Sequence, residues 1–130
     1  MTVGEAAFDI RDVSPDALLR VTLWDRDRGG LRNAIRGPFV GFPLRTDDGI
    51  RHMNDCRLIL GHLELIPGST ADLGVIYLSP DEALRRFPAG TRITLWAGRD
   101  IGEAIVLQVA APGRLLPTLR ERQRSLDERQ

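Results

Sequence analysis

The sequence contains no lysine, because all 18 of its basic residues are arginine. Catalysis through a lysine Schiff base and nucleotide binding through a phosphate-loop lysine are therefore excluded. Cysteine is nearly absent as well, since Cys56 stands alone. No disulfide can form within the chain, and the cysteine content gives no indication of secretion.

Long apolar runs are also absent. No stretch approaches the roughly 18–20 apolar residues that a membrane-spanning helix requires, so no membrane association is expected. The first residues, MTVGEAAFDIRDV, lack the basic start and the apolar core of a secretion signal. We therefore expect a cytoplasmic protein.

Neither sign of charge is in excess. The formal net charge is zero and the isoelectric point is about 6.7, so attraction of the whole surface to nucleic acid or to an anionic membrane is not indicated. Charge can still be gathered locally. The length of 130 residues and the hydrophobic content of 42% fit one domain with a single modest core.

Apolar and polar residues alternate with a period of two in several short segments, which is the pattern of half-buried β-strands. In the first of these segments, Leu19, Val21 and Leu23 occupy the face expected in the core. Glycine and proline turns separate the segments, and they indicate an antiparallel sandwich or small barrel. We predict an all-β fold of six or seven strands over residues 17–111, with an N-terminal arm or edge strand over 1–16 and a polar tail over 112–130.

Three segments leave local alternatives open. Residues 56–66 are apolar on both faces and fit either two short strands or one bent strand with a bulge at Gly61. Ser79 and Pro80 predict the start of a short helix, with Ser79 as the N-cap. The tail fits a short helix for a partner to bind or a solvated extension, and its lack of a clean apolar stripe favours the extension.

Four landmarks containing glycine or proline turns occur between Leu18 and Val109. They are Val21-Thr22-Leu23 leading to Gly29-Gly30, then Gly37-Pro38-Phe39, then Pro67-Gly68, and finally Gly90-Thr91-Arg92-Ile93-Thr94-Leu95 followed by Arg99-Asp100-Ile101-Gly102. In this order they resemble the C-terminal β-barrel, the third domain, of translation elongation factor Tu. The resemblance implies a small antiparallel barrel whose structural turns contain Gly29, Gly30, Gly37, Pro67, Gly68 and Gly102. The phosphate-binding motif GxxxxGK[ST] is absent, so the chain looks like a free-standing version of that barrel.

The resemblance also implies a class of function. Surfaces of the family barrel serve partner proteins and tRNA, so we expect a non-enzymatic binding module with a protein partner. One version is a bacterial, translation-related factor that mimics the elongation factor as a decoy or immunity protein. No cofactor and no nucleotide is expected, and the sequence specifies neither the partner nor the oligomeric state.

The predicted partner-binding surface is rich in arginine. Four guanidinium groups in the loop over 26–36 face a single acid there, Asp27. The surface combines this loop with an aromatic residue and with the last turn between strands, and its residues are Arg26, Arg28, Arg32, Arg36, Phe39 and Arg99. It suits an acidic protein face or, in a second hypothesis, RNA phosphates with bases stacked on Phe39 and Phe42. The alternative is a solvated loop with ion pairs to Asp25 and Asp27, which contribute little.

Other arrangements indicate less. His52, Cys56 and His62 are zinc-ligand types, but their spacing matches no compact metal motif, and no metal site is predicted. Cys56 and His52 lie about 13 Å apart along a strand, too far for a nucleophile and its base. No catalytic residue is predicted, and a small enzyme with a site at the barrel mouth is a third alternative. Trp24 and Trp96 are interpreted as plugs of the barrel ends or as partner anchors.

Overall fold

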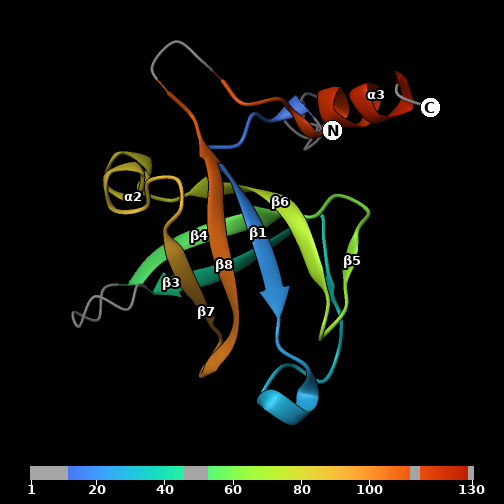
Figure 1. Ribbon diagram of the computed structural model, residues 1–130, viewed down its shortest axis with the longest axis vertical. Coiled ribbons are helices and arrows are strands. Elements are labelled where there is room, and N and C mark those ends of the chain that lie inside the picture. The colour runs from blue at the N-terminus through green and yellow to red at the C-terminus, as the bar shows by residue number, and fades with distance from the viewer. Residues whose placement is uncertain (1–11, 46–52, 112–114, 129–130) are drawn as a thin grey trace, which may run out of the picture.

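The computed structural model describes residues 12–45, 53–111 and 115–128. Six antiparallel strands form a closed barrel in the order β1-β6-β4-β3-β7-β8 (Figure 1). Their bounds are Ala17–Leu23 for β1, Phe39–Arg45 for β3, Met53–Ile59 for β4, Thr70–Tyr77 for β6, Arg92–Trp96 for β7 and Asp100–Val109 for β8. The predicted all-β antiparallel small barrel is confirmed.

The period-two pattern of β1 explains how the barrel fills its interior. Leu19, Val21 and Leu23 are buried while Arg20 between them is exposed. Inward side chains of the other strands complete one continuous apolar core. The core also includes Phe87, which follows the helix over residues 80–86. Fully burying each such Leu or Val contributes about 1.5–3 kcal/mol, which is the main term that favours closure of the sheet.

β1 closes the barrel because it pairs on both edges. Its residues match those of β6 from Ala17↔Val75 to Thr22↔Thr70, and those of β8 from Ala17↔Val109 to Leu23↔Gly102. On the outer surface of the β1–β6 pair, Arg20 Nε lies 2.9 Å from Asp72 Oδ1. β1 and β8 are the first and last strands of the barrel, and their pairing closes it.

A separate two-stranded ribbon joins β2 (Ile35–Arg36) to β5 (Glu64–Leu65). Residues 56–66 therefore form two strands, and the predicted bulge at Gly61 is wrong. Gly61 lies in the turn between β4 and β5 with a left-handed φ of +61°, a conformation that glycine adopts without a steric penalty.

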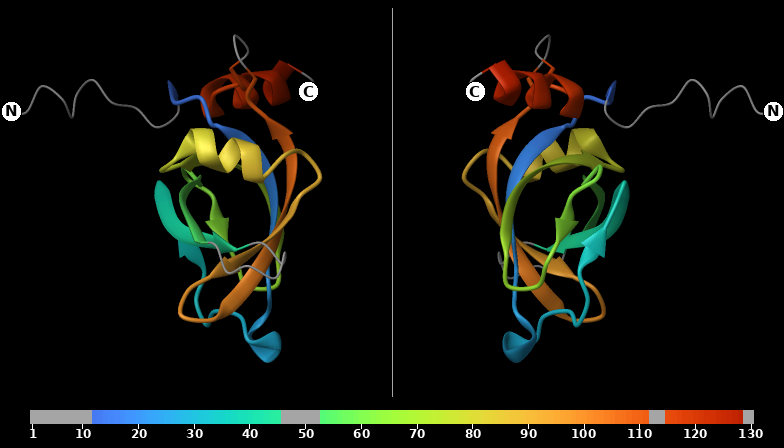
Figure 2. Two further views of the ribbon diagram at one scale, coloured as in Figure 1. Left: turned by 90° about the vertical axis from the view of Figure 1, so that its left-hand side faces the viewer. Right: turned by 90° about the vertical axis from the view of Figure 1, so that its right-hand side faces the viewer.

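Two helical segments lie at opposite ends of the barrel (Figure 2). The short 3-10 helix η2 (Arg26–Arg28) protrudes from one end, and α3 (Leu119–Glu128) lies across the other. The predicted short helix is α2 (Pro80–Arg86), although the Ser79 side chain makes no capping hydrogen bond. Among the described residues, no helix is long and apolar enough to cross a membrane.

The tail contains a helix whose start packs on the barrel, so the favoured prediction of a solvated extension is wrong for residues 116–119, whereas Glu121, Gln123 and Arg124 are exposed. Leu116 and Thr118 are buried, and Arg120 Nε donates to Asp12 Oδ1 at 2.8 Å. Leu119 packs over Gly61, where an added Cβ would lie 2.7 Å from Leu119 Cδ2. Residues 1–11 of the predicted N-terminal arm lie outside the described residues.

Candidate functional site

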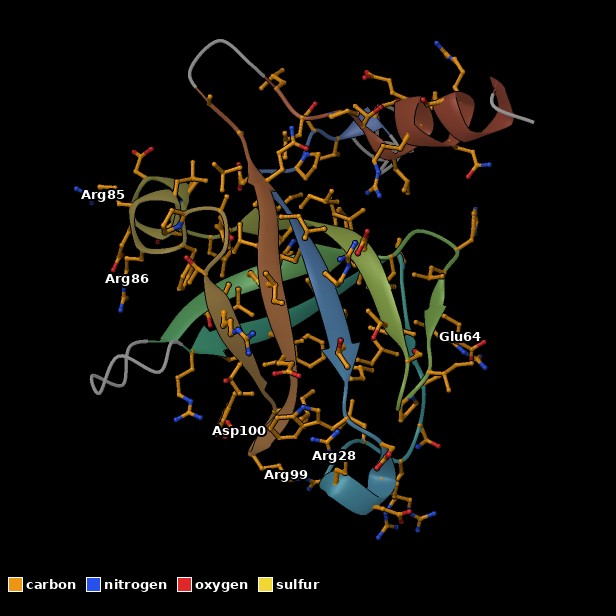
Figure 3. The ribbon with its side chains drawn as sticks, viewed as in Figure 1. Arg28, Glu64, Arg85, Arg86, Arg99 and Asp100 are labelled. Carbon is orange, nitrogen blue, oxygen red and sulfur yellow. The ribbon has the colours of Figure 1, made fainter. Side chains whose placement is uncertain are left out.

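The candidate site is the barrel end at η2, which we call the loop end. It comprises residues 25–32, the turn Ile66–Ser69 and the β7–β8 turn Ala97–Arg99. Figure 3 shows Arg28 and Arg99 beside each other at this end, contributed by segments far apart in the sequence. The Gly68 N–H donates to the Leu23 carbonyl oxygen at 2.9 Å, which fixes the second turn against the end of β1.

Asp25 organises the first turn of the loop end. Its carboxylate Oδ1 accepts a 3.0 Å hydrogen bond from the Arg28 backbone N–H, as an N-cap does. Its carbonyl oxygen accepts from the N–H groups of Arg28 and Gly30 at 3.1 and 2.9 Å. The Asp25 carboxylate is thus engaged by backbone, and among the described residues it forms no ion pair with a guanidinium group.

Gly29 and Gly30 each require glycine, but for different structural reasons. Gly29 ends η2 with a φ of +91°, a left-handed conformation that is strained for any residue with a side chain. A Cβ added at this position would meet no other atom within 4 Å. Gly30 is buried against the backbone, and a Cβ there would collide with the Trp24 carbonyl oxygen. The pair forms a compact turn and not a hairpin reversal, since β1 pairs with β6 and β8.

Arg99 fastens this turn to the neighbouring β7–β8 turn, which precedes the strand that pairs with β1. Its Nε donates to the Gly29 carbonyl oxygen at 2.9 Å and its Nη2 donates to the Gly30 carbonyl oxygen at 3.1 Å. A guanidinium group carries its donors in a rigid fork, so the two bonds fix both position and orientation. We therefore assign Arg99 a positioning role within the predicted surface.

Three arginines of the predicted surface remain available to a partner. Arg26, Arg28 and Arg32 are exposed, and within residues 12–45, 53–111 and 115–128 no ion pair or side-chain hydrogen bond engages their guanidinium groups. Ile66, 57% exposed, adds an apolar side chain to the same end. Sequence reasoning missed Ile66, because only the fold brings its turn beside Asp25.

The other two predicted partner-binding residues do not join this surface. Arg36 donates through Nε and Nη2 to Glu64 Oε1 at 3.2 and 3.1 Å, so a neighbouring carboxylate already compensates its charge. Phe39 begins β3 opposite Ile59, which lies at the α3 end of the barrel. The structure therefore separates Phe39 from the arginine loop, and Phe42, predicted as a stacking surface, is buried in the core.

The remaining predicted turn residues lie where backbone segments approach closely. A Cβ at Gly37 would lie 2.6 Å from the Gly61 carbonyl oxygen, and one at Gly102 would lie 2.5 Å from the Thr22 carbonyl oxygen. Pro67 and Gly68 form the turn that enters β6, and Gly68 has a φ of +87°. These positions shape the barrel, and the glycines among them offer no side chain to a ligand.

The thiol and the imidazoles do not form a site in the described part of the chain. Cys56 is buried, its Sγ donates to the Phe42 carbonyl oxygen at 3.2 Å, and burial raises the pKa of the thiol to about 12. His62 is exposed in the β4–β5 turn, while His52 lies outside the described residues. Among the described residues, no cluster of three His, Cys, Asp or Glu side chains is arranged to hold a metal.

The sequence matches no protein-family model and has no significant match to a curated protein.

Proposed function

We propose that this chain is a non-enzymatic binding module whose loop end holds an acidic face of a protein partner. The observation that carries the proposal is the contact of Arg99 with the carbonyl oxygens of Gly29 and Gly30. A loop ordered before binding loses less conformational entropy on association, so more of its interaction energy appears as affinity. The exposed arginine side chains project from a fixed backbone.

Charge and shape suit a carboxylate-bearing partner. Guanidinium groups pair with carboxylates through two parallel hydrogen bonds, which gives geometric selectivity as well as attraction. Arg26, Arg28 and Arg32 lie within one short loop, so three carboxylates on a partner surface can be engaged together. The exposed Ile66 supplies an apolar contact beside them.

The resemblance to the third domain of elongation factor Tu supports a first choice of partner. A protein that normally grips that domain would hold this chain in its place, which is the decoy or immunity version of the proposal. Competition checks this choice. Purified elongation factor Tu from the source organism, added in excess, is expected to displace the chain from such a partner.

Affinity capture from a lysate of the source organism tests the proposal. The bait is the full chain, compared with a loop-end variant carrying Arg26→Glu, Arg28→Glu and Arg32→Glu. A matched control carries Arg57→Glu, Arg85→Glu and Arg92→Glu, the same charge change at exposed positions of the barrel wall and α2. We expect one protein to be recovered with the wild type and the control and lost with the loop-end variant.

Nuclease treatment separates the RNA alternative. A protein contact survives nuclease, whereas binding to RNA phosphates disappears with it and weakens steeply as salt is raised. Recovery of the same proteins with the loop-end variant as with the wild type would contradict the proposal.

A further inference from the structure

A second surface lies at the other end of the barrel, where α3 meets the β4–β5 turn. The two elements enclose an open groove of about 650 Å³. Leucines from both elements line its apolar part, which we call the floor. Cationic and amide side chains line its polar part, which we call the rim. This volume is within the range of about 300–1,000 Å³ that is typical of ligand-binding pockets.

The floor is made of Leu60, Leu63 and Leu119. Leu60 is buried, whereas Leu63 is 43% exposed and so presents apolar surface to the groove. The close approach of Leu119 to Gly61 holds α3 against the turn. The groove therefore exists because the tail is folded onto the barrel.

The rim carries positive charge. Arg120 and Arg124 stand four residues apart on α3, so their side chains lie on one face of the helix. His62 from the turn also lines the groove, and none of the described residues that line it is acidic. Arg120 is paired with Asp12, whereas Arg124 forms no ion pair with a carboxylate within the described ranges. The guanidinium group of Arg124 is therefore the cationic group of the rim that can pair with an anionic occupant.

We infer that this groove binds a short peptide segment of a partner protein in which leucine-like side chains alternate with carboxylates. Apolar side chains of the segment would cover the leucine floor, and its carboxylates would reach the arginine rim. The groove is open to solvent, so an alkyl chain lying in it would keep part of its surface in water. An alternating peptide instead turns its polar groups outward, and charge complementarity fixes their sign as negative.

This inference does not rest on the proposed function of the loop end, because the two surfaces occupy opposite ends of the barrel (Figure 2). The test is a titration of the ¹⁵N-labelled full chain with the acetylated, amidated peptide ELELE, followed by the backbone amide shifts. We expect shifts at His62, Leu63 and along α3, and weaker binding at higher salt. The peptides KLKLK and ESESE, which lack the negative charge or the apolar side chains, are expected not to bind.

Two matched variants locate the contact. Arg124→Glu is expected to weaken binding of ELELE by about tenfold, as loss of one well-placed charge pair does. Arg122→Glu makes the same charge change on the same helix, but Arg122 lies toward Pro15 and Gly74, so binding is expected to stay within about twofold of the wild type. Leu63→Ser, a change on an exposed turn that leaves the buried core intact, is expected to weaken binding as Arg124→Glu does.

Several results would overturn the inference. Equal effects of Arg124→Glu and Arg122→Glu would mean that net charge alone drives binding. Decanoate that shifts the groove amides when ELELE does not would identify an alkyl carboxylate as the occupant. The loop-end variant is expected to bind ELELE as the wild type does; loss of binding in that variant, with Arg124→Glu unaffected, would move the peptide site to the loop end.

Discussion

Arg99 and Gly29, separated by 70 positions in the chain, are joined by a 2.9 Å hydrogen bond from the Arg99 Nε to the Gly29 carbonyl oxygen. The bond connects the β7–β8 turn to the loop that follows β1. It converts an exposed arginine-rich loop into a part of the barrel end with fixed geometry. The proposed binding surface depends on this fixed loop geometry. Arg99 holds the loop in place, whereas the exposed arginines around it are available to a partner.

Arg99→Ala is expected to loosen the loop end without unfolding the barrel. Two charge-assisted hydrogen bonds are lost, but their site is exposed, so we expect a loss of about 1 kcal/mol in the free energy of unfolding. Amide exchange of Arg28, Gly29 and Gly30 should rise while that of β1 stays unchanged. Arg28→Ala is the control, because its guanidinium holds nothing in the described structure. Unchanged exchange in Arg99→Ala would show that the contact does not order the loop.

Substitution of the two neighbouring glycines should give unequal losses of stability. Gly30→Ala places a methyl group onto the Trp24 carbonyl, so backbone must move, and we expect a loss of about 3 kcal/mol. Gly29→Ala meets open space and has only the left-handed φ to accommodate, which costs about 1 kcal/mol. Chemical denaturation of both variants measures the difference. A larger loss for Gly29→Ala would contradict the described packing.

Cys56 should be inert in the folded protein. Burial, reinforced by Asp55, raises the pKa of its thiol from 9.0 to about 12, although the hydrogen bond to the Phe42 carbonyl oxygen acts in the opposite direction. Ellman's reagent at pH 8 is expected to react only after denaturation. Rapid reaction of the native chain would contradict the burial of this side chain.

The same shift predicts how stability depends on alkaline pH. The unfolded chain releases the Cys56 proton near pH 9 while the folded chain retains it up to about pH 12. The contribution of this thiol to the free energy of unfolding is therefore fully present below pH 9. Above pH 9 the free energy of unfolding falls by about 1.4 kcal/mol per pH unit. Burial also raises the pKa of Tyr77, which adds to the fall. Cys56→Ala should flatten the pH dependence of the unfolding free energy between pH 9 and pH 11.

The ion pair between Arg45 and Asp100 should matter more than the surface pair between Arg20 and Asp72. Arg45 Nη2 lies 2.7 Å from Asp100 Oδ2, and this contact joins β3 to the start of β8, the strand beyond β7. It reinforces a part of the barrel where β3 and β7 pair over only two residues. Asp100→Asn is expected to cost about 1 kcal/mol, because both groups are partly shielded from water. Asp72→Asn, at a more exposed pair, should cost about half as much. Thermal unfolding of both variants shows which substitution causes the larger loss of stability.

The sequence predicts the strands well because their side chains alternate. The period of two in β1 and the turn before β8 are visible in the residues themselves, and closure of the barrel was implied by the family resemblance. The site is less predictable. Phe39 follows Arg32 by only seven positions, yet β2 (Ile35–Arg36) carries the chain toward the opposite end of the barrel between them, so proximity along the chain is misleading here.

Long-range contacts account for the other differences. Nothing near Arg99 in the sequence indicates that its donors reach Gly29 and Gly30, because that contact exists only once β8 pairs with β1 and brings the β7–β8 turn beside η2. The tail lacks a clean apolar stripe, so its sequence does not favour a packed helix. Leu116 of the tail is buried, and Leu119 lies against Gly61 and lines the small space beside Gly74.

Hydrogen exchange of the complex with the captured partner tests the central claim most directly. If the loop end is the contact surface, binding will slow the exchange of backbone amides over residues 25–32 and 66–69. The outer wall around Arg57 and Arg92 should exchange as in the isolated chain. Protection confined to that wall, with the loop end exchanging at its original rate, would contradict the account.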